Sequence, residues 1–171
     1  MGLDILTLTL VHVVISLLAI VTGLVVTGGF LSGRRLDGWT GVYLVTTALT
    51  AITGFLFPFT RFVPALGVGI VSLVLLPFVL WARYGRQLAG GWRRVFVAGS
   101  VLLLYLNVFV LIAQLFLRVP ALIALAPTQS EPTFLFTQLA TLGLFLWLGR
   151  AALRGYSGSP ASSAVRAPLS P

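Results

Sequence analysis

Five stretches of the chain are almost free of charged residues, and each approaches the length that a helix needs to cross a lipid bilayer. An α-helix rises about 1.5 Å per residue, so about 20 apolar residues cover the hydrocarbon core. The stretches comprise residues 5–31, 40–59, 65–82, 95–117 and 133–148. We therefore predict an all-α fold, namely a polytopic transmembrane helical bundle of five helices.

The composition leaves little for a water-exposed surface. Of the 171 residues, 58% are hydrophobic and 8% are charged, whereas a soluble domain has roughly 25% charged residues. We assign residues 1–155 to one transmembrane domain with the lipid bilayer as its partner. Residues 156–171 are rich in serine, proline and alanine, and such segments bury too little apolar surface to fold. They are predicted to form a disordered cytoplasmic tail.

All eleven basic residues are arginines, and their positions alternate along the chain. Arg61 and Arg118 follow the second and fourth stretches, whereas the other nine follow the first, third and fifth. Arginine-rich loops stay in the cytoplasm, so we predict a bacterial inner-membrane protein with its N-terminus outside and its C-terminus in the cytoplasm. Because the clusters fit membrane topology, the net charge of +8 does not indicate nucleic-acid binding.

Similar short motifs recur where the predicted helices end. GRRLDGW (33–39), GRQLAGGW (85–92) and GRAALRGY (149–156) each follow an odd-numbered helix, and RFVPAL (61–66) resembles RVPAL (118–122). These motifs favour a helix pair duplicated in parallel, with the fifth helix as the start of a third copy. The alternative is that glycine, arginine and aromatic residues are simply common at helix ends.

His12 is the only histidine and lies inside the first predicted helix. Helical spacing places it on one face with Ser16, Ala19, Gly23 and Thr27, and small residues on such a face let a neighbouring helix approach closely. An ionisable group within the membrane is a candidate for a proton or ligand site. The alternative is a neutral imidazole that is hydrogen-bonded to a neighbouring helix. One histidine per chain permits haem only in a site shared between chains or with a different second ligand.

Two amides in the fourth helix, Asn107 and Gln114, lie two turns apart. Amides are unfavourable against lipid, so both are expected to face the bundle and to bond between helices or to line a ligand site. In the second helix, Thr50, Thr53 and Gly54 form part of a small polar stripe, which we interpret as a packing face because threonine can bond its own helix.

The loop before the fifth helix contains the only glutamate, Glu131. Glu131 and Pro132 fit the start of a helix, where an acid and a proline are both favoured. Gln138 then lies two turns further on the same face. The alternative is that Gln129, Glu131 and Gln138 line an outward-facing polar site, with or without His12.

No known catalytic motif occurs in the chain. It has no P-loop, GxSxG, HExxH or dinucleotide motif, no cysteine and no cluster of carboxylates. We predict no catalytic residue, no metal and no evident cofactor. The leading hypothesis is a non-enzymatic accessory subunit or small-ligand binder. The alternatives are a proton-linked carrier that uses His12 and Glu131, and a redox protein that binds haem or quinone. A homo-oligomer or larger membrane complex is left open.

The segments GRRLDGWTGVYLVTTALTAITGFLFPF, YLNVFVLIAQLF and ALAPTQSEPTF resemble an uncharacterised family of small multi-pass bacterial inner-membrane proteins. The ALAPTQSEP stretch, in the predicted outer loop, is the specific part of the resemblance. The resemblance implies a location in the inner membrane and brings no activity with it.

Overall fold

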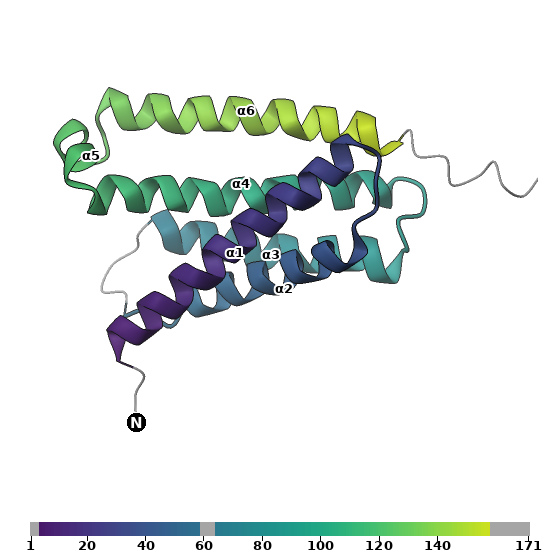
Figure 1. Cartoon of the computed structure of the whole chain (residues 1–171), viewed down its shortest axis with the longest axis horizontal. Helices are drawn as coiled ribbons and strands as arrows, with labels where there is room; N and C mark the ends of the chain where they lie inside the picture. Colours follow the sequence, from purple (N-terminus) through teal and green to yellow (C-terminus); the bar gives the residue numbers. More distant parts are fainter. Residues whose placement is uncertain (1–3, 59–63, 158–171) are drawn as a thin grey trace, which may run out of the picture.

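The computed structural model describes residues 4–58 and 64–157, and all the regular structure in these ranges is helical (Figure 1). The elements are α1 (Ile5–Leu31), α2 (Asp37–Gly54), α3 (Pro64–Leu80), the π turn η1 (Trp81–Gly85), α4 (Trp92–Arg118), α5 (Pro120–Leu125) and α6 (Pro132–Ser157). In the described ranges, α1, α3 with η1, α4 and α6 are each long and apolar enough to cross a membrane. The protein is therefore a helical bundle of the multi-pass membrane class, as predicted.

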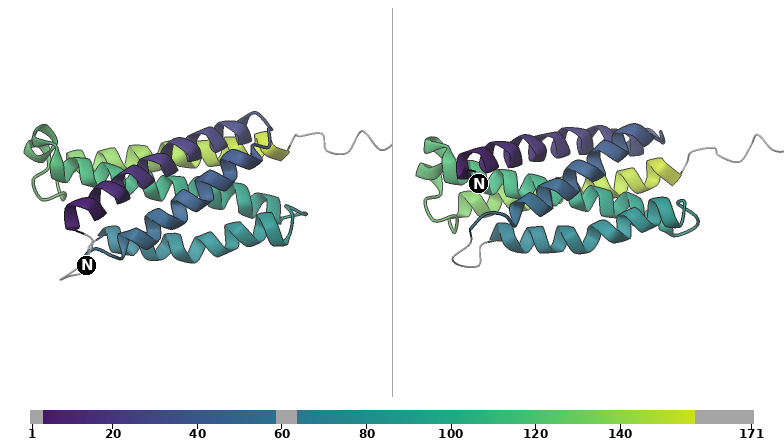
Figure 2. Two further views of the ribbon diagram at one scale, coloured as in Figure 1. Left: turned by 60° about the horizontal axis from the view of Figure 1, so that its bottom comes forward. Right: turned by 90° about the horizontal axis from the view of Figure 1, so that it is seen from below.

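The long helices lie side by side, and successive ones run in opposite directions (Figures 1 and 2). Helix α4 is central, because it contacts α1, α3 and α6, while α2 contacts α1 and α3. We call one end of the bundle the α5 end; it holds the start of α1, the end of α2 and α5. The opposite end, here the arginine end, holds the α1–α2 turn, the loop from residue 86 to 91 and the end of α6.

Most predicted helix limits are close to the observed ones, with two corrections at the α5 end. Helix α2 ends at Gly54 instead of residue 59, because the chain turns at Phe55 and reaches Pro58, which has no amide hydrogen to continue a helix. The predicted outer loop contains a short helix, α5, that begins with Pro120. Proline is favoured in a first helical turn, so the PAL of the RVPAL motif begins α5, directly after α4 has ended at Arg118.

The last helix is longer than predicted. Helix α6 continues to Ser157, whereas its predicted end was residue 148, so it includes the first two residues of the predicted tail. Tyr156 is buried, and its ring packs edge-on against Phe30 of α1 with 5.1 Å between the ring centroids. This aromatic contact explains why the helix persists beyond its apolar stretch. The rest of the predicted tail, 158–171, lies outside the described residues.

Helix α2 buries several threonines and exposes a row of large apolar side chains. Thr40, Thr46 and Thr47 are buried, whereas a row of large apolar side chains is exposed: Val42, Val45, Leu49 and Ile52. In water this arrangement would be unfavourable, because exposed apolar surface is costly. It is the arrangement expected where the surrounding solvent is lipid.

The predicted small face of α1 forms a close contact with two neighbouring helices. Ala19, Gly23 and Thr27 are all buried. A β-carbon added at Gly23 would lie 2.7 Å from Leu104 Cδ1 of α4 and 2.8 Å from Tyr43 Cε2 of α2. Only glycine fits there, so α1 can pack directly on both neighbours.

Gly23→Ala is predicted to destabilise the bundle by about 1–3 kcal/mol, the usual cost of overpacking a close contact. The measurement is the free energy of unfolding in mild detergent. Gly28→Ala is the matched control, because nothing lies within 4 Å of a β-carbon at Gly28 in the same helix. Equal effects of the two changes would contradict the assigned packing.

Candidate functional site

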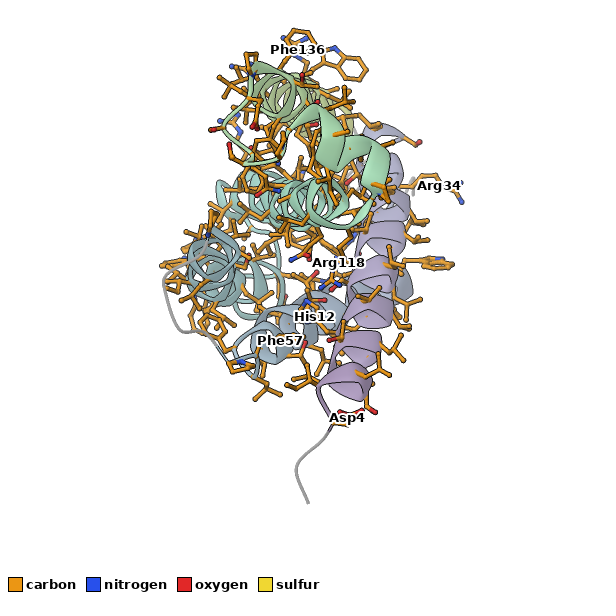
Figure 3. All side chains as sticks on the ribbon, turned by 90° about the vertical axis from the view of Figure 1, so that its left-hand side faces the viewer. Asp4, His12, Arg34, Phe57, Arg118 and Phe136 are labelled. Atoms are coloured by element: carbon orange, nitrogen blue, oxygen red, sulfur yellow. The ribbon has the colours of Figure 1, made fainter. Side chains whose placement is uncertain are left out.

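His12 lies in the part of α1 nearer the α5 end and faces the end of α2. Its Nδ1 is 2.8 Å from Thr53 Oγ1, and its ring packs edge-on against Phe57, with 5.4 Å between the ring centroids. Figure 3 shows His12 and Phe57 next to each other beside α1, far from Phe136 on the outer side of α6. The side chain of His12 is half-buried, so α1 and α2 hold the imidazole without enclosing it.

The hydrogen bonds of Thr53 determine which ring nitrogen of His12 carries the proton. Thr53 Oγ1 lies 2.7 Å from the carbonyl oxygen of Leu49, to which it donates its single hydrogen. The hydroxyl oxygen must then accept from His12, so Nδ1 carries a hydrogen in the neutral ring. Nε2 is left with a lone pair, and no hydrogen bond to it is found among the described residues.

Ser16, the next residue on the same face, is occupied by its own helix. Its hydroxyl donates to the carbonyl oxygen of His12 at 2.7 Å. The predicted threonine stripe of α2 therefore has two roles: Thr46 bonds to α2 itself, whereas Thr53 also orients His12.

The predicted amides are distributed over α4 and its contact with α6. Gln129 Nε2 donates to the carbonyl oxygen of Ala113 at 2.7 Å, and Gln138 Nε2 donates to that of Phe109 at 3.2 Å. These carbonyls are one turn apart on α4. The two glutamines therefore fix the α5 end of α6 and its preceding loop to α4.

Asn107 and Gln114 were expected to bond between helices or to line a ligand site. In the structure, both bond within α4. Asn107 Nδ2 donates to Leu103 O at 3.1 Å, and Gln114 Oε1 accepts from Arg118 Nε at 3.4 Å. A residue four positions away on the same helix is within reach, so one polar atom of each amide is bonded without a second helix.

Glu131 closes a tight turn before α6. Its Oε1 accepts from the Thr128 amide at 3.1 Å and from the Thr128 hydroxyl at 2.9 Å. Burial acts to raise the pKa of the Glu131 carboxyl, but hydrogen bonds from its own amide, Thr128 and Ser130 together hold that pKa below its usual value. Pro132 is the first helical residue, as predicted. Within residues 4–58 and 64–157, no hydrogen bond or ion pair joins Glu131 to His12.

The lowered pKa predicts a turn that loosens in acid. A carboxyl with a depressed folded pKa stabilises the fold above its unfolded pKa of about 4, and this stabilisation is lost as the pH falls through the folded pKa. A spin label at Pro127→Cys should become more mobile below about pH 4. When Glu131→Gln is combined with the spin-labelled Pro127→Cys variant, the label should already be mobile at pH 7. An immobile label at every pH would contradict the role of Glu131.

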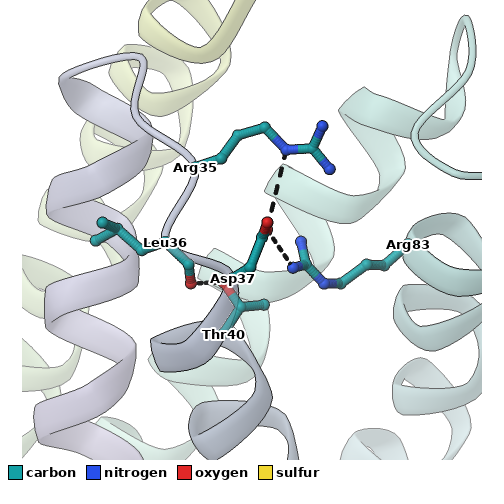
Figure 4. Close-up of polar contacts among 5 residues, drawn as sticks. All are labelled: Arg35, Leu36, Asp37, Thr40 and Arg83. Carbon is teal, nitrogen blue, oxygen red and sulfur yellow. Dashed lines mark hydrogen bonds and ion pairs between the residues drawn. The ribbon is translucent and has the colours of Figure 1, made fainter.

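The arginine end contains one acid, Asp37, among the residues described there. Its Oδ1 lies 2.6 Å from Arg83 Nη2 and 3.9 Å from Arg35 Nε (Figure 4). The Arg83 side chain is 8% exposed, and its guanidinium stacks 5.3 Å from the ring centroid of Phe96. Because Asp37 is 64% exposed, the pair contributes modestly to stability. It joins the start of α2 to η1.

Sequence reasoning missed two features of these sites. It did not pair Thr53 with His12, although both lie on polar or small faces of adjacent helices. It did not single out Arg93 and Arg94, which stand in the first turn of α4, where the helix dipole does not favour a positive charge. Comparisons with protein-family models, curated proteins and solved structures found no match to this chain.

Proposed function

We propose that the chain is a bacterial inner-membrane protein that crosses the bilayer five times, with its N-terminus outside and its C-terminus in the cytoplasm. The alternating helix directions support this topology. The charge distribution supports the orientation, because Arg118 is at the α5 end while the other arginines of the described ranges lie at or near the arginine end.

Helix α2 is the fifth crossing in this proposal. Its 18 residues span about 27 Å, close to the thickness of the hydrocarbon core. Its polar first residues lower its mean hydropathy, and it is not among the four helices of the described ranges that are apolar enough by length and composition to cross a membrane. The outward row of Val42, Val45, Leu49 and Ile52 supports a lipid-facing position, because only the face toward lipid has to be apolar.

Cysteine labelling can test this topology, because the chain has no cysteine of its own. Leu56→Cys and Ser130→Cys should react with a membrane-impermeant maleimide in cells whose outer membrane has been permeabilised. Ser32→Cys and Ala89→Cys should react only after lysis of the inner membrane. Equal labelling at positions 32 and 56 would contradict a crossing by α2.

The parallel duplication and the membership of the uncharacterised inner-membrane family are part of the same proposal. All three Gly-Arg motifs lie near the arginine end, which supports duplication. The first two include turns between helices, whereas residues 149–156 lie inside α6. The third copy, if it derives from the same unit, has therefore kept the sequence motif without the turn.

Within the bilayer, we propose that the protein binds a small lipid-soluble molecule at His12 without acting on it chemically. The observation that carries this proposal is the Nδ1 bond to Thr53, which leaves Nε2 as a fixed acceptor in apolar surroundings. An acceptor in lipid is best satisfied by a hydroxyl donor. The ligand class is therefore a lipid-soluble phenol or alcohol, of which a quinol is one example.

The test is equilibrium binding of a short-chain quinol to the full chain in mild detergent. Loss of one hydrogen bond weakens binding by about tenfold, so His12→Ala should have at least this effect. Thr53→Val should have a smaller effect, because the imidazole remains but is no longer oriented. Ser16→Ala is the matched control, because its hydroxyl bonds only to the backbone of α1.

Two results would overturn the assignment of His12. One is quinol affinity that His12→Ala leaves unchanged. The other is a purified protein with a Soret band that His12→Ala abolishes, because haem would then be the ligand and the acceptor role of Nε2 would be replaced by coordination.

A further inference from the structure

A pocket of about 160 Å³ opens at the arginine end, between the start of α4 and the end of α6. It is large enough to hold several water molecules. This is enough for one phosphate group. The lining residues are Gly90, Arg93, Arg94, Val97, Leu153 and Tyr156.

Arg93 and Arg94 form the charged part of the pocket, and the protein does not neutralise them. Neither side chain makes an ion pair or a hydrogen bond within the described residues. The chain has three acids: Asp4 and Glu131 lie at the α5 end, and Asp37 is bound to Arg83 and Arg35. The two guanidinium groups therefore lack a carboxylate partner in the described part of the chain.

The rest of the pocket is apolar and held in place from behind. Val97 and Tyr156 are buried, and the Tyr156 ring packs against Phe30. A β-carbon at Gly155 would lie 2.5 Å from the carbonyl oxygen of Leu31, so the ends of α6 and α1 are in direct contact. The Tyr156 ring is therefore held in a fixed position as part of the pocket lining. An anion with an apolar part fits this combination better than a bare ion in water.

The loop that borders the pocket has an unusual backbone. Gln87, Leu88 and Gly90 have φ values of 47°, 61° and 53°. For Gln87 and Leu88, which have side chains, this left-handed conformation is unfavourable. Burial of Leu88 and the bond from its amide to Ala82 O at 3.0 Å hold the loop in place. Gly90 therefore reaches the pocket on a segment that is fixed before any ligand binds.

We propose that this pocket binds a phosphate-bearing anion through Arg93 and Arg94. Guanidinium groups match the geometry of phosphate oxygens, to which they donate paired hydrogen bonds. The phosphate can belong to the headgroup of an anionic phospholipid or to a free phosphate, because both offer the same oxygens. In the proposed orientation the pocket faces the cytoplasmic leaflet, where such headgroups are abundant. This site is separate from His12 and does not depend on it.

The experiment uses the full chain in a neutral detergent and measures dissociation constants for two probes. One probe is a short-chain phosphatidylglycerol in mixed micelles, with phosphatidylcholine as its reference. The other is inorganic phosphate, with chloride at the same ionic strength to account for screening. Binding of phosphatidylglycerol alone assigns a lipid headgroup, and binding of inorganic phosphate assigns a free phosphate.

The double variant Arg93→Gln with Arg94→Gln should weaken binding by at least about tenfold. The matched control is Arg34→Gln with Arg150→Gln, which removes the same charge near the same end but outside the pocket and should change affinity by less than about twofold. Leu153→Trp should also weaken binding, because it fills the pocket without changing charge. This variant is a second test that keeps both arginines.

The proposal is overturned if neither probe binds. It is also overturned if the two double variants lose affinity equally, since binding would then reflect only the general positive charge of this end. Normal binding by Leu153→Trp, in a variant with a native unfolding temperature, would place the anion outside the pocket.

Discussion

The approach of α1 to both α2 and α4 at Gly23 is the contact on which the bundle depends. Lipid does not drive helices together as water does, so close packing and hydrogen bonds must hold them. At Gly23 the Tyr43 ring and Leu104 occupy the space of a side chain, and the Tyr43 hydroxyl donates to the Ser100 carbonyl oxygen at 2.7 Å. Three helices are therefore joined at one level, and α3 and α6 pack on this unit.

The same solvent accounts for the use of the polar side chains. A polar atom against hydrocarbon has no water partner, so Gln129 and Gln138 bond to carbonyls of α4, and several threonines bond within their own helices, as Thr46 does. These contacts stabilise the fold and use the amide donors, whereas Gln138 Oε1 is buried without a hydrogen-bond partner among the described residues. Nε2 of His12 is also unbonded, but its ring is positioned by Thr53 and is only half-buried. That partial exposure makes His12 the more accessible of the two acceptors to a ligand.

The arginine end differs, because in the proposed topology it lies at the border of the membrane. Here the fold uses Asp37 to hold Arg83 and Arg35, and the described chain has no further acid nearby. Arg93 and Arg94 stand in the first turn of α4, where the helix dipole opposes them. Their presence beside an apolar pocket is understandable if an anion from outside the protein completes the site. The bundle thus has two separate candidate sites, one near each end.

The sequence by itself determined the class of the protein, the approximate helices and the small face of α1. A bilayer imposes a length and a polarity on each segment, and both can be read along the chain without knowledge of its neighbours. Only the tertiary structure decided the partners. His12 and Thr53 are 41 residues apart, Asn107 bonds within its own helix, and Tyr156 extends α6 by packing on α1. The Arg93–Arg94 pocket likewise exists because the end of α6 folds back beside the start of α4. Such contacts depend on how helices pack in three dimensions, which apolar length and charge do not specify.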